Sequence, residues 1–334
     1  MDKKRIEWID ILKGIGIILV VIGHANFKFA GSTGTMFIQK YIYSFHMPLF
    51  FFLSGYLFVK EKHPNFKKFI KTKIKTLLIP YFFFSILSVL VKFNGFKTII
   101  VQILYLGNKV VWNEPLWFLV CLFVVEIIFY FISQVKSKAK TLFILLIFGI
   151  VGYSLYFIKD YVVLPWSIGV SFTAIVFYGF GNLIRGTDIG SKITSPNRRI
   201  LIICFATNLV IGGILNSIAS MYETTYGKIF YFYIAAFTGV IAYIQIAQYI
   251  KKNNKITKVL EYFGKNSIVV LCTHYLVFFV IRKIDMLNPI LKNYIHIKGY
   301  IYATITLLIS IPVIFTINRF FPWVLGKKKE KSYL

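Results

Sequence analysis

The sequence of 334 residues is 57% hydrophobic and 19% aromatic with only 15% charged residues, a composition that excludes an ordinary soluble domain. Its formal net charge of +27 would suit a nucleic-acid-binding protein, but the basic residues flank hydrophobic stretches and no nucleic-acid-binding motif accompanies them. Anionic lipid head groups are the expected counterpart of this charge, with an anionic substrate on the inner side as an open alternative. We therefore expect an all-α polytopic integral membrane protein with no nucleic-acid partner.

Ten stretches are long and apolar enough to cross a membrane, which takes about 20 mostly apolar residues. In chain order the expected spans cover residues 9–27, 39–59, 76–93, 115–133, 141–158, 165–184, 200–219, 229–250, 266–281 and 300–321. No internal repeat and no soluble appendage is evident. We expect one membrane domain over residues 1–334, with short loops and a basic tail from about residue 323.

The distribution of Lys and Arg predicts that both termini are cytoplasmic. With the N-terminus inside, the inner segments hold 26 basic residues and the outer loops 11, and cytoplasmic loops are the ones that retain positive charge. The first apolar stretch contains Lys13 and no small-residue cleavage pattern follows it, so we expect it to stay in the protein. Cys121, Cys204 and Cys272 all fall within spans, which indicates neither a disulfide framework nor a metal site.

The first span, "DILKGIGIILVVIGHANF", carries ionisable residues that are costly in lipid and usually face a cavity or a partner. Lys13 and His24 are eleven residues apart, almost three helical turns, so they project from nearly the same face about 16 Å apart along the axis. Asp10 lies three residues before Lys13 on that face and can neutralise it. This stripe is our first candidate for a functional site.

The second span contains "YSFHMPLFFFLSGYLF", which places His46 near the outer boundary, beside the end of the first helix. His24 and His46 could thus face one outer cavity. The alternative is that each imidazole only hydrogen-bonds a helix carbonyl.

The run "KKFIKTKIKTLLIPYF" leads into the third span and places Lys71, Lys73 and Lys75 at the inner membrane boundary. Such runs commonly mark topology only. Lysine is also a competent point-charge ligand for phosphate, so these residues are candidates for holding an anionic cofactor.

The fourth span begins with "NEPLWFL". Glu114 sits at the start of a helix, where its charge is favoured by the helix dipole, and beside Trp117 it could instead orient a sugar hydroxyl. Deeper in the span, Glu126 is expected to pair with a buried base. In the ninth span, His274 follows the helix-start signal "GKNS" and is expected to have a packing role.

The pieces "IDILKGIGIILVVIGH", "FHMPLFFFLSGYLF", "KIKTLLIPYFFF", "EPLWFLVCLF" and "FGKNSIVVLCTH" resemble, in this order and spacing, the integral membrane acyltransferases of acyltransferase family 3. The branch they resemble includes fucose 4-O-acetylase and polysaccharide O-acetyltransferases. In that family a basic residue, usually arginine, precedes a histidine by eleven positions in the first helix, and Lys13 and His24 match it. The resemblance implies that His24 is catalytic.

The match is looser at the third span, where much of the family carries a basic pair, commonly two arginines. Lys73 and Lys75 fit this pair loosely, with Thr76 and Leu77 where a second base would be expected. Many relatives also carry a fused extracytoplasmic hydrolase-like domain, and this chain resembles the form without it.

The resemblance implies transfer of an acyl group, most often acetyl from cytosolic acetyl-CoA, to a sugar hydroxyl of a surface polysaccharide or its lipid-linked precursor. It also implies a multi-pass protein of a bacterial cytoplasmic membrane, in contact with membrane lipids and needing no metal. The ordinary pKa of an imidazole is about 6.5. A neutral His24 could therefore take the proton of the acceptor hydroxyl, or it could carry the acetyl group itself. His46 and Lys13 could support the oxyanion. The distance between Lys13 and His24, however, favours a donor-binding role for Lys13.

Two other classes of protein stay open at this point. Ten helices with buried His, Glu and Lys could form a proton-coupled glycan or lipid transporter, although no inverted repeat or paired broken helices are evident. A non-catalytic scaffold of a glycan-assembly complex is the third reading.

Overall fold

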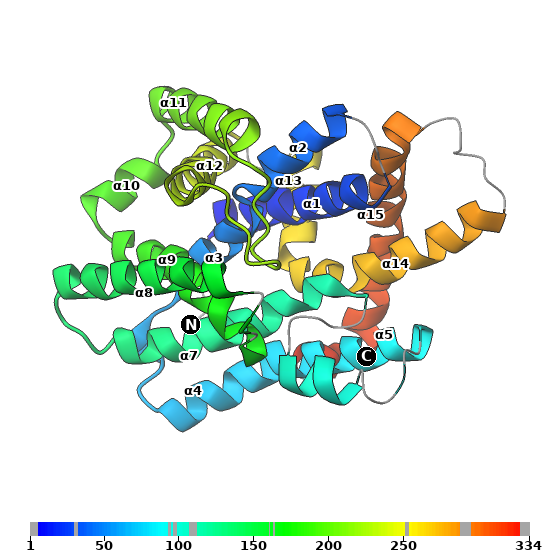
Figure 1. Ribbon diagram of the computed structural model, residues 1–334, viewed down its shortest axis with the longest axis horizontal. Coiled ribbons are helices and arrows are strands. Elements are labelled where there is room, and N and C mark those ends of the chain that lie inside the picture. The colour runs from blue at the N-terminus through cyan, green and yellow to red at the C-terminus, as the bar shows by residue number, and fades with distance from the viewer. Residues whose placement is uncertain are drawn as a thin grey trace. The chain divides into compact units, whose positions relative to one another are not determined.

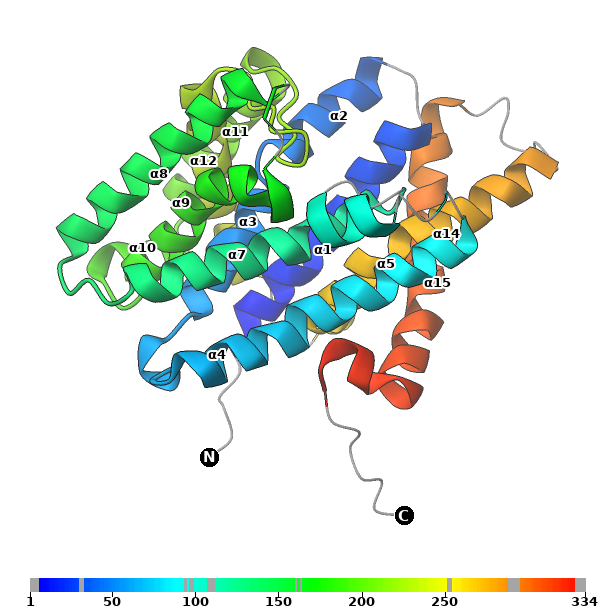
Figure 2. The same cartoon turned by 60° about the horizontal axis from the view of Figure 1, so that its bottom comes forward.

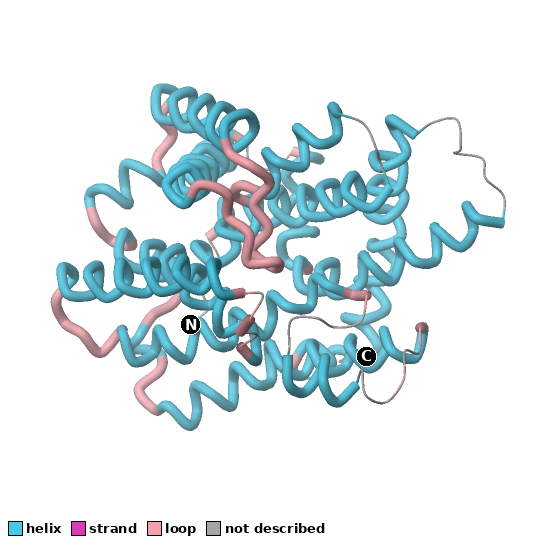
Figure 3. Tube along the Cα trace, viewed as in Figure 1, coloured by secondary structure: helices cyan, strands magenta, loops and turns pink. Residues whose placement is uncertain are grey.

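The computed structural model describes residues 6–29, 33–92, 95, 99–106, 112–159, 161–162, 164–250, 254–287 and 295–327. These residues form helices joined by loops and no strand, apart from one isolated β-bridge between Ser220 and Thr225 (Figure 3). The all-α class is confirmed. Residues 328–334 of the expected basic tail and the expected inner residues Lys3, Lys4 and Arg5 lie outside the described part.

The helices include π turns (η2, η3 and η6) and 3₁₀ turns (the other η elements). In chain order they are α1 (Glu7–Phe29), α2 (Thr33–Tyr43), α3 (His46–Leu57), η1 (Lys60–Lys62), α4 (Phe66–Lys73), η2 (Ile74–Leu78), α5 (Ile79–Val91), η3 (Ile99–Leu106), η4 (Glu114–Leu116), α7 (Trp117–Ile132), α8 (Lys138–Ile158), η5 (Pro165–Ser167), α9 (Ile168–Ile184), α10 (Asp188–Thr194), α11 (Arg198–Asn208), η6 (Leu209–Leu215), α12 (Ile229–Tyr249), α13 (Lys255–Lys265), α14 (Ser267–Leu287), α15 (Ile295–Phe320) and η8 (Pro322–Leu325).

Within the described residues, nine helical segments are long and apolar enough to cross a membrane. Each overlaps one of the ten expected spans, and only the expected span 39–59 has no such single helix. The protein is therefore a multi-pass membrane protein.

The expected span 39–59 consists of two short helices, α2 and α3, separated by a turn at Ser44 and Phe45. Pro48 explains the break, because it has no N–H to donate to the carbonyl of Ser44 four residues before it. The Ser44 hydroxyl secures the turn by donating to the Tyr41 carbonyl (2.7 Å) and accepting from Asn208 Nδ2 (2.9 Å). α3 is clearly more apolar than α2, but hydropathy alone does not locate the turn between them.

The third span begins ten residues before the expected position 76, because the lysine run itself is helical. Phe66–Val91 continues without interruption from α4 through the π turn η2 into α5, as the blue-to-cyan ribbon shows (Figure 2). Asn65 caps the start by accepting from the backbone N–H of Lys68 (3.1 Å). The π turn ends just before Pro80, which cannot donate to the carbonyl four residues before it.

The chain divides into two compact units, each made of three segments. The first unit comprises residues 1–57, 177–267 and 284–305, and the second comprises residues 58–176, 268–283 and 306–334. Both are discontinuous in sequence, so neither could be delimited from a composition shift along the chain.

In the first unit, α13 lies against α1 (Figure 1). The expected spans leave residues 251–265 as a basic loop, but from Lys255 onward these residues form an amphipathic helix that buries Phe263 and Gly264. Glycines permit the close approach: a Cβ at Gly14 would collide with the backbone oxygen of Leu260, and one at Gly264 with that of Asp10. The beginning of α1, which carries Asp10 and Lys13, is held in this way.

The second unit packs η2 against α4, α5 and α7. Tyr81 of α5 donates its hydroxyl to the carbonyl of Ile103 in η3 (2.8 Å), and Trp166 of η5 donates to the carbonyl of Leu104 (2.9 Å). Just before α5, a Cβ at Gly326 would collide with the backbone oxygen of Lys75, so the turn after η8 lies directly on η2.

Candidate active site

His24 and His46 lie side by side in the first unit. Their ring centroids are 6.1 Å apart and the ring planes are perpendicular. The ring of Tyr43 adjoins both, with centroids 5.8 Å from His24 and 4.9 Å from His46. We call His24 and His46 the histidine pair.

The pair is formed by the packing of α1 against the turn between α2 and α3. Gly23, next to His24, faces Ile42 and Tyr43 so closely that a Cβ there would lie 3.1 Å from Ile42 Cγ2 and 3.2 Å from the Tyr43 ring. The break at Ser44 makes His46 the first residue of α3. Both features bring the two imidazoles together from separate helices.

His46 is held in a single tautomer by its own backbone. It is 3% exposed, and its Nδ1 lies 2.9 Å from the carbonyl oxygen of Ile42, which can only accept, so Nδ1 carries the proton. In the neutral ring, Nε2 is then left as an acceptor. The expected alternative, a hydrogen bond to a helix carbonyl, is thus present for His46. This bond fixes the orientation of the imidazole ring.

His24 is half-buried. Lys13 is half-buried on the same helix, and Asp10, one turn before it, is 6% exposed. Because α1 is one continuous helix over Glu7–Phe29, the expected spacing of about three turns between Lys13 and His24 holds.

In the second unit, Lys73 and Glu126 form a largely buried ion pair. Lys73 Nζ lies 2.8 Å from Glu126 Oε1, with side chains 20% and 6% exposed. The base that pairs with Glu126 is therefore Lys73, which its place in the lysine run also makes a candidate cofactor ligand. Lys75, another candidate in this run, is exposed. The sequence could not show the pairing because 53 residues separate the two side chains.

We expect Glu126→Ala to destabilise the protein, because it leaves the Lys73 ammonium largely buried without its carboxylate. Removing one partner of a buried pair costs about 3 kcal/mol or more. The midpoint of thermal unfolding, followed by the fluorescence of the five tryptophans, should fall clearly below that of the wild type.

Two variants serve as controls for this prediction. Glu261→Ala removes the partner of Lys265 from an exposed pair of the same length, 2.8 Å, and should shift the midpoint little. The double variant Lys73→Met, Glu126→Leu should recover part of the lost stability, since it removes both charges. An unchanged midpoint for Glu126→Ala would show that the pair contributes nothing.

Glu114 lies at the start of η4 and receives a hydrogen bond from the hydroxyl of Tyr275 in α14 (3.3 Å). The adjacent Asn113 is fully buried and donates to Ser88 Oγ and to the carbonyl of Cys272, both at 3.0 Å. Trp117 is 4% exposed and packs inside the unit, so it does not present its ring at the surface. Glu114 is thus part of a polar cluster that ties the start of the fourth span to α14.

His274 is fully buried in the same unit. Its Nδ1 lies 2.8 Å from the carbonyl of Val270, and its ring contacts Tyr275 and Phe278. These contacts agree with the expected packing role.

The described residues contain no group of three His, Cys, Asp or Glu side chains that could hold a metal ion.

Sequence reasoning missed Tyr43 and Tyr275 as site residues. Tyr43 precedes His46 by three residues, one helical turn, but the break at Ser44 hides this relation. Tyr275 directly follows His274, and only the tertiary structure connects it with Glu114.

The family model described as "Acyltransferase domain", Acyl_transf_3, matches residues 6–319. The chain belongs to acyltransferase family 3. This match spans nearly the whole chain, including the histidine pair, the Lys73–Glu126 pair and the cluster around Glu114. Neither a curated protein nor a solved structure matches the sequence. The protein is a membrane acyltransferase, which leaves its acyl donor and its acceptor to be inferred from the site.

Proposed function

We propose that this acyltransferase transfers an acetyl group from cytosolic acetyl-CoA to a hydroxyl of a sugar. The acceptor is a surface polysaccharide or its lipid-linked precursor, and the enzyme resides in a bacterial cytoplasmic membrane. The observation that carries the proposal is the histidine pair, because an acyltransferase must move a proton from an attacking alcohol and an imidazole is suited to this.

His24 is the proposed base. It is half-buried and therefore reachable, whereas His46 is buried and oriented by its bond to the Ile42 carbonyl. The acceptor hydroxyl gives its proton to His24 as its oxygen attacks the thioester carbonyl, and the carbon–sulfur bond then breaks. The proton passes to the departing thiolate, so that an ester and free CoA are formed. His46 and Tyr43 position the His24 ring by edge-to-face contact.

Lys13 is the proposed contact for the donor. Its ammonium lies on the same helix as His24 but about 16 Å away along the axis, too far to touch the reacting carbonyl. The pantetheine and phosphate portions of CoA extend far from the thioester and carry its negative charge. Within the second unit, Lys75 is exposed in the π turn of the third span and is a candidate phosphate contact in its own right, while the pairing with Glu126 makes Lys73 a weaker one.

Within the second unit, Glu114 is a candidate contact for a sugar hydroxyl. Its carboxylate is partly exposed and already accepts from the Tyr275 hydroxyl, and a second lone pair could accept from a sugar hydroxyl. Trp117 is buried, so its ring is not presented to a sugar.

The test uses purified full-length protein in detergent with acetyl-CoA labelled in the acetyl group. Release of CoA and transfer of label to an oligosaccharide acceptor are expected. A deletion of the gene in the host should remove O-acetyl groups from a surface glycan, measured by NMR. Labelled succinyl-CoA and longer acyl-CoA donors, assayed in parallel, decide the acyl group. Label retained on the donor with every acceptor, together with an unchanged glycan in the deletion strain, would contradict the proposal.

A further inference from the structure

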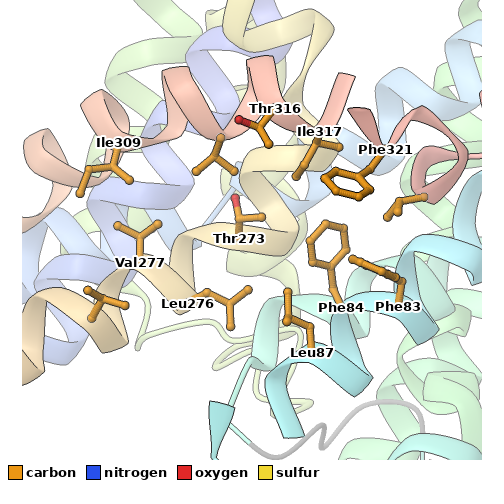
Figure 4. Close-up of a pocket in the computed structure, with 13 residues that line it drawn as sticks. Phe83, Phe84, Leu87, Thr273, Leu276, Val277, Ile309, Thr316, Ile317 and Phe321 are labelled. Atoms are coloured by element: carbon orange, nitrogen blue, oxygen red, sulfur yellow. The ribbon is translucent and has the colours of Figure 1, made fainter. Parts of the chain in front are cut away.

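An apolar groove of about 390 Å³ opens between α5, α14 and α15 in the second unit, within the range of about 300–1,000 Å³ typical of ligand sites (Figure 4). Each helix contributes one face: Phe83, Phe84 and Leu87 from α5, Leu276 and Val277 from α14, and Ile317 from α15 are among its lining residues. The Thr273 hydroxyl donates to the Val269 carbonyl of its own helix (2.8 Å). The proton of this hydroxyl is thus used within the helix.

The groove is open to the outside of the unit rather than enclosed. Val280, Ile309 and Phe321, which line it, are among the exposed large hydrophobic residues of the protein. All three helices belong to spans long and apolar enough to cross a membrane. The medium in contact with the opening is therefore lipid hydrocarbon, and a hydrocarbon chain is the ligand that such a wall can accept.

Basic residues follow the groove-lining residues of α15 in the sequence. Phe83, Phe84 and Phe321 mark the end of the groove where α15 gives way to η8 (Figure 4). Arg319 is exposed in the last turn of α15, and Lys327 donates from Nζ to Asn318 Oδ1 (2.9 Å).

The π turn η2 also adjoins this end of the groove. The turn at Gly326, in the left-handed region with φ 68°, lies against the backbone of Lys75. The sequences 66–91 and 306–327 contain no acidic residue, so nothing along these two segments opposes the positive charge.

We propose that this groove binds an anionic glycerophospholipid, with one acyl chain between α5, α14 and α15 and the phosphate head group at Arg319 and Lys327. The apolar wall fits the chain and the basic residues fit the phosphate. Basic pockets between membrane helices are known to recognise anionic head groups in this way. The site is separate from the acetyl-transfer proposal, because none of its residues belongs to the histidine pair or to the candidate donor and acceptor contacts except through the backbone of Lys75.

The test measures lipid retention by native mass spectrometry on full-length protein, delipidated in detergent. The added lipid is phosphatidylglycerol or phosphatidylcholine with the same acyl chains, and no acyl donor or acceptor is present. We expect retention of phosphatidylglycerol with an affinity about tenfold above that of phosphatidylcholine. Equal affinity for the two lipids would overturn the proposal.

Variants separate the two parts of the site. Ile317→Trp fills the groove and should abolish retention of both lipids, whereas Ile311→Trp, an exposed isoleucine of α15 that does not line the groove, should retain them. The double variant Arg319→Gln, Lys327→Gln should keep binding but lose the preference for phosphatidylglycerol. In vesicles, phosphatidylglycerol with a photoreactive acyl chain should label peptides of α5, α14 or α15. Labelling confined to other helices, or undiminished retention by Ile317→Trp, would refute the site.

Discussion

The variant His24→Ala is expected to lose acyl transfer by at least about a hundredfold while remaining folded and membrane-inserted. A positioned general base contributes about 10²–10⁴-fold, and removal of a side chain that carried the acetyl group would cost more. The ring is half-buried rather than part of the tight core, so its loss should leave the unfolding midpoint near that of the wild type. Transfer of labelled acetyl by the purified variant, at saturating donor, measures the effect.

The control is His63→Ala, which removes another half-buried histidine that contacts the Phe58 and Phe69 rings and lies outside the proposed site. It should transfer acetyl at the wild-type rate. Added imidazole should restore part of the activity of His24→Ala, since a missing base can be supplied from solution and a lost packing contact cannot. Wild-type transfer by His24→Ala would end the assignment.

The second large effect is expected for Lys13→Ala, as an increase in the KM for the acyl donor of about tenfold to a hundredfold with little change in kcat. A hydrogen bond to a charged group contributes about 1.5–3 kcal/mol, and each 1.4 kcal/mol corresponds to a factor of ten. The position of Lys13, about three turns from His24, favours contact with the donor away from its reacting carbonyl. Steady-state kinetics with varied acetyl-CoA separates the two constants.

Two substitutions calibrate this measurement. Lys13→Arg keeps the charge at the same place and should remain close to the wild type. Lys28→Ala removes an exposed lysine from the last turn of the same helix, where its ammonium lies 5.5 Å from the Phe27 ring centroid, and should leave the donor KM unchanged. A reduced kcat with an unchanged KM for Lys13→Ala would instead give Lys13 a direct part in the chemistry.

The membrane class and most of the spans could be predicted from the sequence because they depend on local hydropathy. Each of the nine helical segments overlaps an expected span, and the relation between Lys13 and His24 follows from the geometry of one uninterrupted helix. Element boundaries were less predictable. The lysine run from Phe66 to Lys73 has the polar composition of a loop. It is nevertheless helical, because it continues into a span and Asn65 caps its start.

The contents of the site were only partly predictable. That His24 and His46 face one another was a reasonable expectation from two consecutive spans, but Tyr43 joins them only because Pro48 and Ser44 interrupt the helix at that point. Similarly, Glu126 was expected to find a base, and the identity of that base depended on how α7 packs against the π turn after Lys73.

Two properties of this protein follow from local patterns in the sequence. It is an α-helical membrane protein, and its first helix carries a basic residue and a histidine on one stripe. Periodicity and hydropathy act over neighbouring residues, so one helix can be interpreted alone. Three other features appear only once the helices are packed: the two adjoining imidazoles, the pair of Lys73 with Glu126, and the groove among α5, α14 and α15. These depend on contacts between segments far apart in the chain, set by close backbone approach and side-chain packing that no local pattern encodes.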